Sequence, residues 1–172
     1  MVDNEKRIPI LIQTKELKFA IMNKTHVTAR SLQSSGKLTY EAASNAQQTE
    51  FKEDGYELNR AISDAIAEAK LALSEYLADG TDKADNLVRK AVDDGEALTL
   101  TFQFPSNYNN AAVDELGSAI HDFIVGRSIY EWYRQTYPEI AEACRIDAMA
   151  ALGRAKEAQY KRRRPERPKY TP

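Results

Sequence analysis

Three long segments of this chain carry apolar residues at steps of three and four, the period of a helix with one buried face. They span 56–78, 111–135 and 139–164. Pro138 stands just before the last of them, where a missing N–H costs nothing. Pro165 disfavours helical geometry at the residue before it and so marks the end of that helix. The pattern predicts a mainly α fold, a bundle of four to five helices.

A second pattern, strict alternation of apolar and polar residues, occupies 98–104. Alternation with period two places one set of side chains on a buried face and predicts a β-strand. Asp94 and Gly95 lie just before this strand and form a dipeptide that is favoured in two-residue turns. The sequence therefore predicts a β-hairpin near 86–104, inserted into the helical bundle.

The turn at Asp94-Gly95 also predicts the register of that hairpin. It sets Ala91 opposite Leu98 and Leu87 opposite Phe102. The alternative is that 83–92 forms a short helix, and the pattern alone leaves both open.

The N-terminal part is less regular. The apolar stretch 8–12 is interrupted by Pro9 and predicts an extended lead-in. Thr14 is a candidate N-cap for a helix over 15–23. The polar stretch 24–54 predicts a long loop with one or two short helices, and loops of that length often bind partners.

Composition is that of a soluble globular domain: of 172 residues, 42% are hydrophobic and 29% charged. No apolar run is long enough to span a bilayer, and the first residues lack the apolar core of a signal peptide. Cys144 is the single cysteine, which excludes an intramolecular disulfide. We therefore expect one domain over 1–160, with no membrane contact.

No catalytic or metal-binding pattern accompanies these elements. The two histidines, His26 and His121, occur without the Glu-x-x-His or Cys-x-x-Cys spacings of zinc sites. Neither a Gly-x-Ser-x-Gly elbow nor a phosphate loop occurs. The sequence predicts a protein that is not an enzyme and has no cofactor, and the alternative is an enzyme with a scattered carboxylate site.

Charge is divided unevenly along the chain. Residues 154–172 hold eight basic and two acidic residues, a balance of +6, and the rest holds 16 basic and 24 acidic residues, a balance of −8. We call 161–172 the C-terminal arm, expect it to be extended, and assign its candidate partner-binding residues as Lys161, Arg162, Arg163, Arg164, Pro165, Arg167, Lys169 and Tyr170. Prolines lower the ordering cost of docking on an acidic surface. Contact with phosphates and a merely solvated end stay open.

Four aromatic residues cluster around the turn before Pro138: Tyr130, Trp132, Tyr133 and Tyr137. They predict helix packing around that turn. Tryptophan and tyrosine are also common anchors of protein interfaces, so Tyr130, Trp132 and Tyr133 are candidate inter-subunit contacts, and both interpretations stay open.

The stretches 98–109, 120–125, 128–133 and 160–165 resemble small structural proteins of tailed phages and prophages of gut bacteria. These are head–tail connector subunits, the neck ring or adaptor proteins. The resemblance implies a helical fold with a long loop or hairpin, in a ring, commonly a dodecamer, below the portal protein. The C-terminal arm would dock on the portal, and Asp94 and Gly95 would be inter-subunit or lumen-facing.

The same resemblance implies a virion protein, assembled in the host cytoplasm and located at the neck. Its other partners would be tail-side neck proteins and DNA that passes through without sequence-specific contact. An acidic body agrees with such a conduit, because like charge repels phosphate. The alternative is a small nucleic-acid-binding protein that uses the basic arm.

Overall fold

The computed structural model describes residues 5–48, 52–78 and 97–165. These ranges form a mainly α fold with a two-stranded antiparallel sheet, as the sequence predicted. The helices are α1 (Thr14–Ser34), α2 (Tyr40–Asn45), α3 (Lys52–Ala72), α4 (Val113–Tyr133) and α5 (Pro138–Gln159), the strands are β1 (Lys6–Gln13) and β2 (Ala97–Phe104), and a 3₁₀ turn, Asn110–Ala112, precedes α4.

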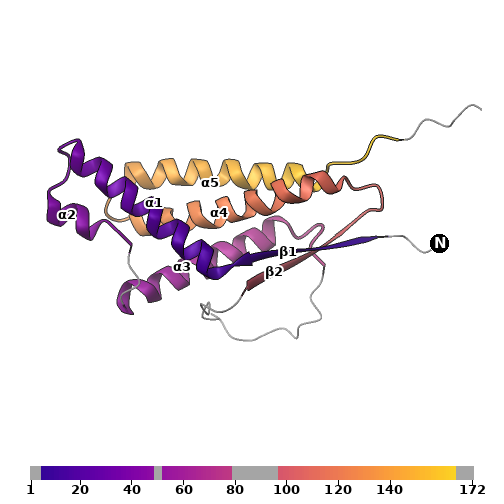
Figure 1. Ribbon diagram of the computed structural model, residues 1–172, viewed down its shortest axis with the longest axis horizontal. Helices are drawn as coiled ribbons and strands as arrows, with labels where there is room; N and C mark the ends of the chain where they lie inside the picture. Colours follow the sequence, from indigo (N-terminus) through magenta and orange to yellow (C-terminus); the bar gives the residue numbers. More distant parts are fainter. Residues whose placement is uncertain (1–4, 49–51, 79–96, 166–172) are drawn as a thin grey trace, which may run out of the picture.

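Helix α4 forms the centre of the bundle. In Figure 1, α5 runs along one side of α4, whereas α3 and the sheet lie on the other and α1 crosses in front. A helix covered on several sides must be apolar around most of its circumference. Accordingly, α4 buries a large set of side chains, among them Leu116, Ile120, Phe123, Ile124 and Ile129.

The sheet joins segments that are far apart in the chain. β1 pairs with β2 in antiparallel register, from Lys6 opposite Phe104 to Gln13 opposite Ala97. Ile10 and Ile12 are buried, so the short apolar lead-in of the sequence is a strand that helps to close the core. Pro9 suits an edge strand, because it cannot donate to a ladder.

The strand that pairs with β2 is therefore β1, a partner that the sequence did not predict. Ile8 lies opposite Phe102 on one edge of β2, and Leu77 lies opposite Phe102 on the other. Ala78 N donates to Thr101 O at 2.8 Å beside this contact. Phe102 therefore has a backbone neighbour on each edge of β2. Residues 87–91, Asp94 and Gly95 lie outside the described residues.

The bounds of three helices differ most from the sequence prediction. α1 begins at Thr14 itself, with Gln13 as N-cap, and continues to Ser34 because Thr25 and Ala29 extend its buried side. α3 ends at Ala72, six residues early, because the chain turns to bring Leu77 to β2. α5 ends at Gln159 rather than at 164.

Candidate docking surface at the C-terminal segment

The first residues of the C-terminal arm are bound to the body of the protein. After α5, Asn109 N donates to Lys161 O at 3.1 Å, and Arg163 N donates to Asn107 O at 2.8 Å. These two bonds form an isolated antiparallel bridge between Tyr108 and Arg162. The arm therefore leaves the domain about two residues after residue 161, the position that the sequence predicted.

The Arg162 side chain fixes this bridge to a pair of tyrosine rings. Its guanidinium lies 5.6 Å from the Tyr76 ring centroid and 6.0 Å from that of Tyr108. Nη2 donates to Tyr76 Oη at 3.0 Å, and Nη1 donates to Gln159 O at 2.9 Å. Arg162 is thus an internal anchor, and its charge is engaged by the body rather than offered to a partner.

Tyr108 forms the floor of the anchor and was not identified from the sequence. It is fully buried, its ring stacks on Phe104 with centroids 3.9 Å apart, and its hydroxyl donates to Ala158 O at 3.2 Å. Burial raises the pKa of Tyr108, and the nearby positive charge of Arg162 opposes that rise. The aromatic spacing of Phe102, Phe104 and Tyr108 was the available signal, since three rings just before a helix require a common core.

Beyond the anchor the basic residues become exposed. Arg163, Arg164 and Pro165 are exposed, whereas Arg167, Lys169 and Tyr170 lie outside the described residues. Lys161 Nζ lies 2.6 Å from Glu157 Oε1. The candidate docking surface within the described ranges is therefore Arg163–Pro165, at the point in Figure 1 where the chain leaves the end of α5.

Arg154, the first residue of the basic stretch 154–172, also belongs to the body. Its two terminal nitrogens lie 2.9 Å from Glu115 and 2.9 Å from Asp122, both on α4. These carboxylates raise the pKa of Arg154. The basic surface of the C-terminal end is consequently smaller than the charge count predicted.

The aromatic cluster before Pro138 divides into a buried and a partly exposed part. Tyr133 is fully buried, and its hydroxyl lies 3.1 Å from Ala46 O and 3.3 Å from Thr25 O. Trp132 Nε1 donates to the same Ala46 oxygen at 3.0 Å. Tyr133 is thus a packing residue and its assignment as an inter-subunit contact is corrected. Tyr130 and Trp132 are partly buried.

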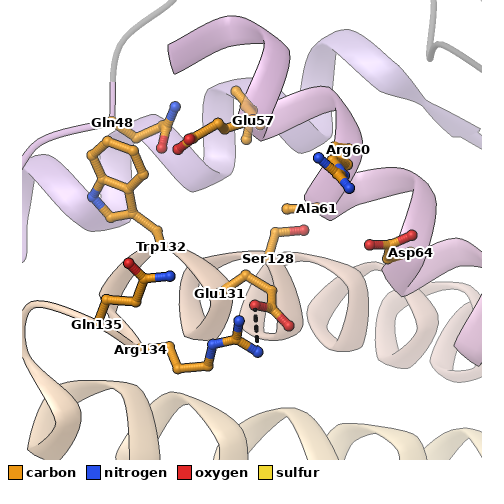
Figure 2. A pocket seen from close by; sticks show the side chains of 11 residues that line it. Gln48, Glu57, Arg60, Ala61, Asp64, Ser128, Glu131, Trp132, Arg134 and Gln135 are labelled. Atoms are coloured by element: carbon orange, nitrogen blue, oxygen red, sulfur yellow. Dashed lines mark ion pairs between the residues drawn. The ribbon is translucent and has the colours of Figure 1, made fainter. Parts of the chain in front are cut away.

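A polar pocket of about 380 Å³ lies between α3 and α4 (Figure 2). Glu131 pairs across its floor with Arg134 at 3.2 Å, and Ser128 Oγ donates to Ile124 O at 2.8 Å within its own helix. The Ser128 hydroxyl proton is therefore bound by a backbone carbonyl. A carbonyl oxygen is not a general base, so it does not activate Ser128 as a nucleophile. The lining residues are Gln48, Glu57, Leu58, Arg60, Ala61, Asp64, Ser128, Glu131, Trp132, Arg134 and Gln135.

Two further properties concern only the ranges that the structure describes. No group of three or more His, Cys, Asp or Glu side chains there is placed to hold a metal ion. No helix among them has the length and apolar character needed to cross a membrane.

Comparison with known proteins gave no relative. No protein-family model, curated protein or solved structure matches the chain. A function for this chain is therefore proposed from the contacts and charges described above.

Proposed function

We propose that this chain is a structural subunit of a phage head–tail connector. It forms a homo-oligomeric ring at the virion neck, docks to the portal protein through its C-terminal arm, and lines the conduit for DNA. Tail-side neck proteins are its partners on the opposite face. The observation that carries the proposal is the anchored base of the arm, followed at once by exposed Arg163 and Arg164.

The anchor gives the arm a fixed starting point. Two backbone hydrogen bonds and the Arg162 side chain hold residues 161–163 on the bundle. A segment that is ordered before binding loses less entropy when it docks. Arginine forms paired hydrogen bonds with carboxylates, which suits an acidic surface on a partner protein.

The proposal is tested by removing the exposed charges and keeping the anchor. The variant Arg163→Ala/Arg164→Ala is purified beside a matched control, Arg30→Ala/Arg60→Ala, which removes two exposed arginines elsewhere. We expect the first variant to lose co-purification with the portal protein and to yield fewer joined heads and tails. The control should keep both functions, and all proteins should melt at similar temperatures.

A deletion of 164–172 is the stronger form of this test, since it leaves the Tyr108–Arg162 bridge in place. Normal portal binding and normal particles after that deletion would refute docking through the arm.

The nucleic-acid alternative is tested in the same preparation. DNA affinity measured at two salt concentrations would fall with a log–log slope of about −0.9 per phosphate contact. The structure reduces the expected number of contacts, because Arg154, Lys161 and Arg162 are engaged within the chain. Strong, salt-dependent DNA binding that is lost in Arg163→Ala/Arg164→Ala would replace the connector proposal.

A further inference from the structure

Helix α5 carries an exposed apolar stripe on the side away from α4. Ile146 is 56% exposed and Met149 is 47% exposed. Ala143, Ala150 and Gly153 are exposed on the same side. The positions 143, 146, 150 and 153 follow steps of three, four and three, the spacing of a seam between two packed helices. In Figure 1, α5 lies along the edge of the bundle, beside α4, and the exposure of these residues shows that no described part of the chain covers this side.

Gly153 has no explanation within the described part of the chain. A Cβ atom added there would meet nothing within 4 Å. Gly126 is different, because its Cβ would lie 3.0 Å from Ala148 Cβ at the α4–α5 contact. Glycine weakens an exposed helix relative to alanine. A glycine with open space outside it, between exposed Ile146 and the helix end, admits the close approach of a second helix from another molecule.

The stripe continues into a groove between α1 and α5. This groove has a volume of about 580 Å³, with Gly126 and Ile129 of α4 among its lining residues. Val27 of α1, which is 58% exposed, lies on one side, and Ala150 of α5 lies on the other. Ala150 belongs to both the stripe and the groove, whose other side chains are partly charged, among them Lys24, Asp122 and Arg154. The apolar surface itself is therefore the stripe on α5.

Charge along α5 selects the occupant and its direction. In the first half of α5, exposed Glu139, Glu142 and Asp147 outnumber Arg145, which pairs with Glu142. Near or just beyond its end, exposed Arg154, Lys156 and Lys161 outnumber Glu157, which pairs with Lys161. Two parallel copies would bring like charges together. Two antiparallel copies bring the acidic start of each helix to the basic end of the other, which makes the surface complementary to itself.

We propose that two copies of this chain pair through the outer faces of α5, antiparallel and about a two-fold axis near Met149 and Ala150. Ile146 of each copy fills the space outside Gly153 of the other. Glu142 of each copy lies beside Lys156 of the other. This pairing is independent of the proposed function, because it requires neither the C-terminal arm beyond residue 164 nor the portal.

The first experiment measures the mass of the purified full-length chain over a range of concentrations by light scattering or sedimentation. We expect a concentration-dependent dimer. Ile146→Glu/Met149→Glu should be monomeric, with the circular dichroism spectrum and unfolding transition of a folded monomer. Leu71→Glu, at a side chain that is 78% exposed on α3, is the matched control and should still dimerise. A monomeric wild type, or a dimer that survives the double substitution, would overturn the proposal.

The second experiment tests direction. In a Cys144→Ser background, Met149→Cys lies next to its own counterpart at the axis and should form a disulfide-linked dimer on mild oxidation, whereas Leu71→Cys should not. Glu142→Lys should raise the dimer dissociation constant several-fold, and adding Lys156→Glu should restore it. Failure of both the crosslink and the restoration in a chain that still dimerises would exclude the antiparallel arrangement.

A larger assembly in place of the dimer, still dissociated by Ile146→Glu/Met149→Glu, would count against the two-fold pairing. Loss of portal binding in the arm variants with the dimer intact would leave this proposal standing. A monomer that still binds the portal would overturn this proposal alone.

Discussion

Replacement of Tyr133 and Trp132 by phenylalanine, one at a time and together, tests how the α2 segment is held against α4. Both side chains donate to the Ala46 carbonyl, Tyr133 Oη at 3.1 Å and Trp132 Nε1 at 3.0 Å. Ala46 is only 4% exposed, so water does not readily replace a lost donor. The shared acceptor makes the two side chains energetically dependent on each other.

The hydrogen bonds set the expected magnitude. Tyr133→Phe removes one donor and should lower the free energy of unfolding by about 1 kcal/mol. Trp132→Phe removes the other and loses some packing as well, so its cost is at least similar. The double variant leaves the buried carbonyl with neither donor, and we expect its loss to exceed the sum of the single losses by about 1 kcal/mol.

Urea unfolding followed by far-ultraviolet circular dichroism measures all variants alike, because Trp132 is the only tryptophan and tryptophan fluorescence would disappear with it. Tyr40→Phe, at a residue that is 77% exposed, is the control and should change stability by less than about 0.5 kcal/mol. Additive losses would refute the shared acceptor. A double variant as stable as the wild type would refute the burial of this cluster.

Three further predictions concern the arm, the core and pH. Arg162→Ala should lower the free energy of unfolding by about 1–2 kcal/mol and speed chymotrypsin cleavage near the end of α5, whereas Arg163→Ala should do neither. Gly126→Val should cost about 1–3 kcal/mol in thermal unfolding, because the added atoms meet Ala148 across the α4–α5 contact. Burial, followed by the nearby Cys144 and Tyr137, raises the pKa of Tyr133 above its ordinary value of 10.0. The unfolded chain therefore releases the Tyr133 proton at a lower pH than the folded chain, so this tyrosine contributes stability below about pH 10 and less as pH rises further. In urea unfolding, the free energy of unfolding of Tyr133→Phe should fall less than that of the wild type between about pH 8 and about pH 11.

Local patterns in the sequence predicted local structure. The alternation in 98–104 identified β2, and the spacing of apolar residues identified α3, α4 and α5. The partner of β2 was missed because Asp94-Gly95 offers a nearby turn, whereas the true partner, β1, lies about 90 residues away. Such pairing depends on burial of Ile10 and Ile12 in a common core, which no local pattern reveals.

Helix ends were predicted less well for a related reason. α1 continues through the polar stretch after residue 23 because a few small buried residues, Thr25 and Ala29, pack on its inner side. α3 ends early because Leu77 forms a β-bridge with Phe102 of β2. In both cases a tertiary contact decides the boundary, and helix propensity does not.

For the candidate docking surface, the sequence shows basic residues near the chain end but does not separate anchored from exposed ones. Arg162 and Arg163 are neighbours of identical chemistry. The fold brings Tyr76 and Tyr108 together beside Arg162, which makes Arg162 an anchor, whereas Arg163 stays exposed.

The distant pairing of β1 has a consequence for synthesis in the cell. Lys6 finds its place only beside Phe104, so the first strand emerges from the ribosome long before its partner exists. At synthesis rates of about 5–20 residues per second, it waits on the order of ten seconds with an open edge. During that time Pro9 hinders association with other nascent chains, because proline has no backbone N–H to donate across the open edge of β1. Chaperone depletion should therefore lower the yield of folded Pro9→Val protein more than that of the unaltered chain.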